Sequence, residues 1–125
     1  FFKNDNLKVL HVAPEQCFHP IFKKQKNLDY ITADIVSPIA DLHFDLHDIP
    51  LKDNSFDVIF CNHVLEHVED DHKCMKELYR VMKKGGWGIF QVPIDYNNKI
   101  TYEDPKIISP KDREKHFWQK DHGCW

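Results

Sequence analysis

Residues 56–92 read FDVIFCNHVLEHVEDDHKCMKELYRVMKKGGWGIFQV, and this stretch decides the fold. It opens with Phe56–Cys61, a continuous apolar run of the length expected for a buried strand. It closes with a second apolar run, Trp87–Val92. Apolar side chains recur between the two runs at the spacing of one helix face: Cys74, Leu78 and Val81. Two strands joined by a helix predict parallel pairing within an α/β sheet.

The ends of this helix carry recognisable signals. Asp70 or Asp71 supplies the N-cap, because an aspartate side chain can accept a hydrogen bond from an unpaired N–H of the first turn. Lys83 and Lys84 favour the negative end of the helix dipole. The pair Gly85-Gly86 predicts a left-handed stop. The helix is therefore expected to run from the aspartates to the glycines.

The upstream half of the chain repeats the alternation. Three further strands are expected at Lys8–Val12, Leu28–Ala33 and, as a short one, Leu42–Phe44. A short helix is expected from Pro20 to about Gln25, because proline lacks the N–H that would be unpaired in a first turn. The whole pattern predicts a Rossmann-like, mostly parallel α/β sheet with flanking helices, formed by a single domain over residues 1–125.

Composition argues against several classes of protein. The chain has 125 residues, 42% hydrophobic and 30% charged, as in ordinary globular domains. Its formal net charge is −3 and no run of lysine and arginine exceeds two residues, so neither nucleic acid nor a membrane surface is an expected partner. No apolar stretch approaches the ~20 residues of a membrane-spanning helix, and no secretory signal is recognisable. Four cysteines without a CxxC pair favour reduced thiols and a cytoplasmic location.

Acidic residues follow two of the expected strands. Asp34 comes directly after Leu28–Ala33, and Asp45-Leu46 follows the short third strand. Ligands of open α/β sheets bind outside the carboxyl ends of the strands, where a carboxylate can accept two hydrogen bonds from a ribose diol. Asp45-Leu46 would present one carboxylate and one apolar contact to a purine ring. The alternative is that both aspartates only cap turns.

The segment after Phe56–Cys61 also contains a metal-binding pattern. His63, Glu66 and His67 spell H-x-x-E-H, which inverted zinc metallopeptidases share. On a helix the two histidines would lie on one face, and the glutamate would activate a metal-bound water. A zinc hydrolase is therefore a remote alternative. It is disfavoured because the pattern requires a long helix, whereas a strand is expected to end at Cys61, with only Asn62 between it and His63.

Three segments form a longer recognisable pattern: DIPLKDNSFDVIF from residue 48, NHVLEHV from residue 62 and ELYRVMKKGG from residue 77. This pattern resembles the middle of class I S-adenosylmethionine-dependent methyltransferases, the type 11 domain in particular. With the first two strands included, the resemblance reaches from Lys8 to about Ile94. It implies an enzyme that takes S-adenosylmethionine and releases S-adenosylhomocysteine. The family fold normally has seven strands; five are counted here, so the last two are expected to be missing and the chain to be a fragment.

The resemblance also implies roles for matching residues. The implied cofactor-binding residues are Asp34 and Ile35 at the ribose, Asp45 and Leu46 at the adenine, and Asn62 and His63 at the methionine end. His63 is the candidate general base, which is needed only if the acceptor is protonated. Weaker candidates are Asp95, Tyr96 and His116.

The first loop departs from the family pattern of an acidic residue followed by glycines. Here the sequence is HVAPEQC, so His11 stands at the acidic position, and Ala13, Glu15 and Cys17 stand where glycines are expected. Pro14 also removes an N–H donor. We expect Ala13, Pro14 and Glu15 to line the cofactor in a variant loop. Glu15 would pair with the ammonium or sulfonium of the cofactor.

These observations favour methyl transfer from S-adenosylmethionine to a small-molecule or saccharide acceptor. The altered first loop keeps a second hypothesis open, a binding module that holds the cofactor without turnover. The zinc hydrolase is the third and remote one.

Overall fold

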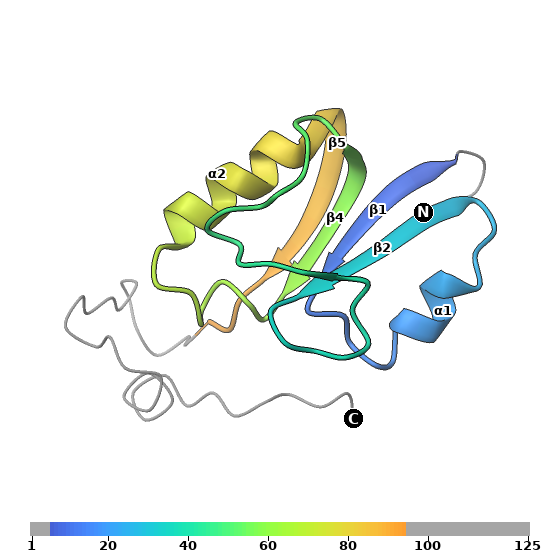
Figure 1. The fold of residues 1–125 in the computed structure, drawn as a ribbon, viewed down its shortest axis with the longest axis horizontal. Coiled ribbons are helices and arrows are strands. Elements are labelled where there is room, and N and C mark those ends of the chain that lie inside the picture. The colour runs from blue at the N-terminus through green and yellow to red at the C-terminus, as the bar shows by residue number, and fades with distance from the viewer. Residues whose placement is uncertain (1–5, 95–125) are drawn as a thin grey trace.

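The computed structural model describes residues 6–94, which form five strands and two helices (Figure 1). The elements, in chain order, are β1 (Leu7–Val12), α1 (His19–Lys23), β2 (Leu28–Asp34), β3 (Leu42–His43), β4 (Phe56–Asn62), α2 (Asp71–Val81) and β5 (Met82–Gln91). Every strand expected from the sequence is present, with ends shifted by one residue or a few.

All five strands belong to one parallel sheet in the order β3-β2-β1-β4-β5. The central strand β1 pairs with β2 on one side and with β4 on the other, so that Val12 lies beside both Ala33 and Cys61. All carboxyl ends therefore lie at the same edge of the sheet (Figure 1). The Rossmann-like prediction is confirmed.

Alternating side chains send two apolar layers to opposite faces of the sheet. One layer contains Leu10 and Ile59 together with Leu78, so α2 covers that face. The other contains Val9 and Val58 with partly buried aromatic side chains, among them Phe22 of α1. Figure 1 shows the two helices on opposite sides of the sheet. Cys74, Leu78 and Val81 are fully buried, which confirms the predicted helix face.

The junction of α2 and β5 differs from the prediction. The helix ends at Val81 rather than at the glycines, and β5 begins at once with Met82. Met82 pairs with Phe56, and the pairing register then shifts before Val58. Gly85 adopts the expected left-handed conformation, with φ of +80°, but it lies inside this irregular part of β5. Residues that the local signals assigned to the helix thus belong to β5, because they lie in the strand that pairs with β4.

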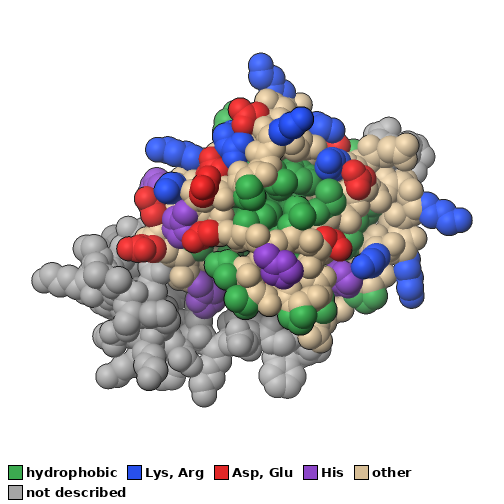
Figure 2. All heavy atoms as spheres, viewed as in Figure 1, with side chains coloured by type: hydrophobic (Ala, Val, Ile, Leu, Met, Phe, Trp, Pro, Cys, Tyr) green, Lys and Arg blue, Asp and Glu red, His purple; other side chains and the backbone are tan. Residues whose placement is uncertain are grey.

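Two of the cysteines lie in the core as free thiols, Cys61 and Cys74. Cys17 is disulfide-bonded, so the prediction of reduced cysteines is wrong at that position. Among residues 6–94 no helix has the length and apolarity needed to cross a membrane. In the view of Figure 2, lysine and arginine side chains project mainly from the periphery of the molecule, with acidic groups between them.

Candidate functional site

Loops from distant parts of the chain meet at the carboxyl edge of the sheet. The strand order places the loops after β1 and β4 side by side, because the chain turns from β1 to β2 on one side and reaches β4 on the other. Asn62, at the end of β4, donates a hydrogen bond from Nδ2 to Glu15 Oε1 at 2.9 Å. This edge is the topological switch point at which open α/β sheets bind ligands.

Glu15 is the centre of a hydrogen-bonded network in this edge. Its Oε2 lies 2.5 Å from Nε2 of His11, and Nδ1 of the same ring lies 2.7 Å from the Tyr30 hydroxyl. His11 is 1% exposed, in contact with the rings of Phe22 and Phe60 as well as Tyr30. The position at which the family has an acidic residue thus holds a buried imidazole that binds a carboxylate four residues later.

The network keeps Glu15 ionised. Burial alone would raise the pKa of this carboxyl group, but the hydrogen bonds from His11 and Asn62 outweigh burial and hold the pKa below its ordinary value. Burial, followed by the negative charges of Glu15 and Asp41, raises the pKa of Tyr30. The Tyr30 hydroxyl therefore keeps its proton.

The rest of the first loop is close to the backbone of β2. The Ala13 N–H donates to the carbonyl oxygen of Ala33 at 2.8 Å, and Ala13 takes a positive φ of +48°. A positive φ is the conformation that the family's glycine would adopt freely. Pro14 is buried beside it. The loop therefore keeps a glycine-like path without glycine.

Asp34 ends β2 and has two possible tasks. Its Oδ1 accepts hydrogen bonds from the N–H groups of Val36 and Ser37, both at 2.8 Å, so the turn-capping alternative is correct for this oxygen. Its Oδ2 has no hydrogen-bond partner among the described residues and can accept from a ligand. Ile35 follows with an exposed side chain.

Asp45 and Leu46 lie further along the same edge but point differently. The Asp45 carboxylate is mostly exposed and accepts from the His47 backbone and ring. These hydrogen bonds from His47 outweigh burial and hold the pKa of Asp45 below its ordinary value. Leu46 is buried in the core layer under α2. Nε2 of His47 in turn accepts from the Asp70 N–H at 3.1 Å, which links this loop to the N-cap of α2.

His63 follows Asn62 with a positive φ of +54°, held by a backbone hydrogen bond to Gln91 at 2.8 Å. Its Nδ1 lies 3.6 Å from Oε1 of Glu66, and Nε2 of His67 lies 3.9 Å from the same oxygen. The Glu66 side chain is only 10% exposed, and neither carboxylate oxygen has a hydrogen-bond partner among residues 6–94. Sequence reasoning about methyl transfer missed Glu66; only the metal pattern included it.

The zinc interpretation is not supported by this geometry. Residues 63–70 form turns and bends rather than a helix, so the histidines lack the shared helix face that the pattern requires. In the described part of the chain, the group whose potential ligand atoms lie within 4.8 Å of one another is Asp70, Asp71 and His72, all exposed. The weaker base candidates Asp95, Tyr96 and His116 lie outside the described residues.

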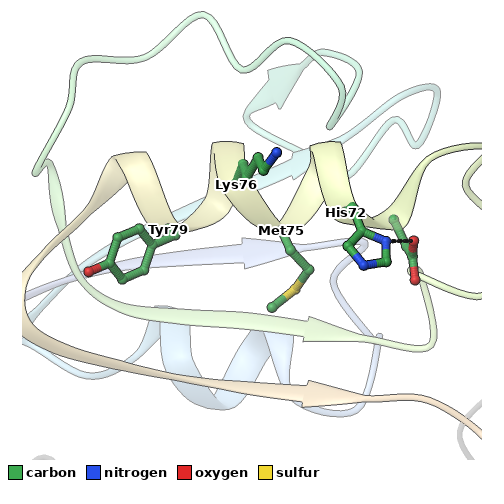
Figure 3. Close-up of a pocket in the computed structure, with 5 residues that line it drawn as sticks. His72, Met75, Lys76 and Tyr79 are labelled. Atoms are coloured by element: carbon green, nitrogen blue, oxygen red, sulfur yellow. Dashed lines mark hydrogen bonds and ion pairs between the residues drawn. The ribbon is translucent and has the colours of Figure 1, made fainter.

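Among the described residues, one hollow lies beside these loops and another lies along α2. A cavity of about 290 Å³ reaches His11 and Asn62 on the α1 side of the sheet, and its other lining residues are Phe18, Phe22, Phe60, Trp87, Ile89 and Gln91. A second hollow lies along α2, where Figure 3 shows His72, Met75, Lys76 and Tyr79. Residues of α2 alone line that second hollow, so it has no part in the switch-point site.

Comparison with known proteins identifies the family. Residues 9–90 match the family described as methyltransferase domain. A Mycolicibacterium smegmatis protein named a probable S-adenosylmethionine-dependent methyltransferase is 33% identical over 81 residues, which are 60% of this chain and 30% of that protein. The chain spans about a third of the length of the curated relatives it matches.

Solved structures share the fold at low identity. The trans-methyltransferase CalH in complex with SAH has a TM-score of 0.57 at 12% identity, over 68% of this chain and 31% of that one. The 4+2 cyclase SpnF has a TM-score of 0.55 at 16% identity, over 65% and 36%. The family match covers more than half of the chain, with the switch-point loops inside it. The chain therefore belongs to the methyltransferase domain family.

Proposed function

We propose that this chain is the cofactor-binding core of an S-adenosylmethionine-dependent methyltransferase that acts on a small-molecule or saccharide acceptor. The observation that carries the proposal is that Glu15, Asp34 and Asn62 lie at the carboxyl ends of the neighbouring strands β1, β2 and β4, with Asn62 hydrogen-bonded to Glu15. Carboxylates at this edge suit a ligand with hydroxyl and ammonium groups.

The residues present fit such a cofactor. The Oδ2 of Asp34, which the turn does not use, would accept from ribose hydroxyls, with Ile35 beside it. The loop Ala13-Pro14-Glu15, a variant of the family's first loop, would border the methionine portion together with Asn62. The Asn62 Oδ1 is buried without a hydrogen-bond partner among the described residues, so a hydrogen-bond donor of a ligand would satisfy it.

Asp45 would approach the adenine. Leu46 can support the adenine site only by packing in the core beneath it, because its side chain is buried.

Transfer of a methyl group from a sulfonium is an in-line displacement, and the bound cofactor supplies the activated methyl. The contribution of this chain is to hold the reactants in line, which can supply roughly 7–11 kcal/mol of the barrier reduction. His63 is the proposed base for a protonated acceptor. Its ring is 42% exposed, so it can reach an acceptor, and Glu66 lies 3.6 Å from Nδ1 to orient it.

The size of the acceptor is proposed from the cavity on the α1 side. Its volume of about 290 Å³ is near the lower end of the range of small-molecule pockets. Aromatic side chains dominate its lining, and Asn62 and Gln91 add polar groups. Such a lining suits a sugar ring or another compact molecule. Nucleic acid and membrane remain unexpected as partners. A cytoplasmic location stays part of the proposal on the ground of the free thiols Cys61 and Cys74, although the disulfide at Cys17 does not support it.

A second candidate is a cofactor-binding module without methyl transfer. The loop HVAPE favours it, because three family glycine positions hold other residues. SpnF, which shares the fold, is named a cyclase, so the fold alone does not imply methyl transfer. Turnover assays with a panel of acceptors would separate the two, because only the first candidate consumes S-adenosylmethionine.

Calorimetric titration with S-adenosylhomocysteine tests the proposal. The wild-type chain is expected to bind one equivalent. Asp34→Asn keeps an oxygen for the turn but removes the charge, and is expected to weaken binding about 10- to 100-fold, the range for a hydrogen bond to a charged group. Asp29→Asn, an exposed carboxylate near the other end of β2, is the matched control and should bind as the wild type does. Equal affinity in both variants would contradict the ribose assignment, and no binding by the folded wild type would contradict the proposed function.

A further inference from the structure

The cavity on the α1 side of the sheet has its polar side chains at one end. Its lining residues on β4 and β5 lie opposite one another in rows, Phe60 beside Ile89 and then Asn62 beside Gln91. Trp87 precedes Ile89 by two residues on β5 and lies on the same face, further from the carboxyl edge. The two amides therefore stand at the carboxyl edge of the sheet, and the apolar side chains follow behind them.

Aromatic rings form most of the remaining wall. The Phe22 ring of α1 stacks on Phe60, with ring centroids 5.3 Å apart and planes inclined by 14°, and Phe18 stacks on Phe22 at 5.9 Å and 13°. Trp87 meets Phe60 at right angles with centroids 6.0 Å apart, and the His11 ring contacts Phe22 and Phe60. These are the stacked and edge-to-face arrangements that aromatic rings prefer, so a further ring can join the cluster.

The lining offers hydrogen bonds at the amide end and hardly elsewhere. None of its eight residues, all in the described part of the chain, is lysine, arginine, aspartate or glutamate. Both ring nitrogens of His11 already bond inside the protein, to Tyr30 and Glu15. Asn62 carries one amide N–H beyond the one that it donates to Glu15, and Gln91 is exposed. A saccharide would leave most of its hydroxyls without partners here, and a phosphorylated ligand would meet no cation.

We propose that this cavity binds the body of a neutral aromatic acceptor, a phenol or an aromatic amine, with its hydroxyl or amino group at Asn62 and Gln91. This inference rests on the proposed function and deepens it, because it narrows the acceptor to one chemical class. Asn62 also bonds to Glu15 at the edge proposed for the cofactor. The amide end is therefore the end at which the polar group of the acceptor and the cofactor would meet.

Four probes, titrated into the full chain of 125 residues, test the class of acceptor. 2-Naphthol is a neutral aromatic alcohol, decahydro-2-naphthol is its saturated form, 2-naphthyl phosphate is its anionic ester, and methyl glucoside is a saccharide. We expect 2-naphthol to bind about 2- to 10-fold more tightly than the saturated alcohol, the range for an added aromatic contact, and the other two to bind more weakly still. NMR chemical-shift titration measures the four affinities. A probe of another class that binds as tightly as 2-naphthol would overturn the assignment.

Two variants test the location. Ile89→Phe puts a ring into the cavity and is expected to weaken 2-naphthol about 10-fold or more, while S-adenosylhomocysteine affinity changes by less than about twofold. Ile21→Phe makes the same change at an exposed position of α1 outside the lining and is the matched control. Unchanged 2-naphthol binding in Ile89→Phe, or an equal loss in the control, would place the ligand elsewhere and overturn the proposal.

Gln91→Leu tests the orientation, and because Gln91 is exposed this variant also guards against misfolding of the Ile89 variant. Loss of the amide should weaken 2-naphthol about 3- to 10-fold, as expected for one hydrogen bond, and change the binding of naphthalene, which lacks the hydroxyl, by less than about twofold. Equal effects on the two ligands would overturn the placement of the polar group.

An acceptor has to occupy its site together with the cofactor. The chain saturated with S-adenosylhomocysteine should therefore still bind 2-naphthol, and mutually exclusive binding would overturn the role as acceptor site. If S-adenosylhomocysteine does not bind the folded wild type, the proposed function fails and the acceptor assignment fails with it. If S-adenosylhomocysteine binds and 2-naphthol does not, this inference alone fails.

Discussion

Ala13 adopts a backbone conformation that glycine favours, and this residue makes a direct test of the first loop possible. Its φ of +48° costs an alanine about 1–2 kcal/mol. Ala13→Gly removes that cost but loosens the unfolded chain by about 0.4–1 kcal/mol. We therefore expect the free energy of unfolding to stay level or rise by up to ~1.5 kcal/mol, as measured by urea denaturation.

The matched control is Ala33→Gly, at the neighbouring position on β2. Ala33 is fully buried and lies in a regular strand, so its loss removes a packed methyl group and adds chain entropy. A decrease of about 1–2 kcal/mol is expected for the control. An equal decrease in Ala13→Gly would show that the left-handed conformation of Ala13 is not populated in solution.

At the residue scale, the sequence indicated candidate positions for the site but not the contacts between them. The absent glycines of HVAPEQC marked an unusual loop, and Glu15 was placed in it. No local pattern indicates that Glu15 would meet Asn62, 47 residues later, because that contact exists only when β1 and β4 pair. Glu66 was similarly visible only as part of a metal pattern, since burial of a carboxylate is a tertiary property.

At the element scale, Glu77 and Arg80 join α2 to the loop before β4. Arg80 donates to the carbonyl oxygens of Ile49 and Leu51 at 2.7 and 2.8 Å, and Glu77 accepts from the Ile49 N–H at 2.9 Å. The hydrogen bond from Arg80, more than any other contact, lowers the pKa of Glu77 to about 2. The turn-rich segment between Asp45 and β4 is thereby fixed along α2.

The lowered pKa gives α2 an acid-sensitive contribution to stability. The unfolded chain binds the Glu77 proton at an ordinary pKa near 4.5, whereas the folded chain resists it until about pH 2. Stability from this group is complete above about pH 4.5 and is lost as the pH falls toward 2. Glu77→Gln should therefore flatten the fall of Tm over this window, by on the order of 5 °C. Thermal melts followed by circular dichroism measure it.

Glu69→Gln makes the same charge change at an exposed position just before α2 and serves as the control. Its melting curve should keep the wild-type slope with pH. If Glu77→Gln also keeps that slope, the Glu77–Arg80 contact does not persist in solution.

Helix and strand ends show why elements were easier to predict than their junctions. The N-cap at Asp70 depends on side chains within one turn, and the structure has that hydrogen bond, from the Lys73 N–H at 2.9 Å. The end of α2 depends on pairing between Met82 and Phe56, 26 residues apart in the chain, which local glycine signals cannot report. The prediction consequently placed the helix end too late.

At the scale of the whole molecule, the fold followed from the alternation of apolar runs and helix periodicity, since each strand of a parallel sheet is buried on both faces and reads as apolar. The order of the strands did not follow from these patterns. The order decides which loops meet. The resemblance could therefore propose candidate residues for the site, but not their geometry.

The same topology predicts how ligand binding and stability are linked. Glu15, Asp34 and Asn62 follow three different strands and come together only in the folded sheet, so S-adenosylhomocysteine should bind the folded chain and not the unfolded one. At 100 times its Kd the ligand should then stabilise the fold by about 2.7 kcal/mol. For a domain of this size that corresponds to a rise in Tm of roughly 10 °C or more, measurable by differential scanning fluorimetry. At the same ligand concentration, Asp34→Asn, with its affinity lowered about 10- to 100-fold, should lose half or more of the rise and Asp29→Asn should keep it. A rise of equal size in both variants would mean that the ligand stabilises the chain from a site other than the strand ends.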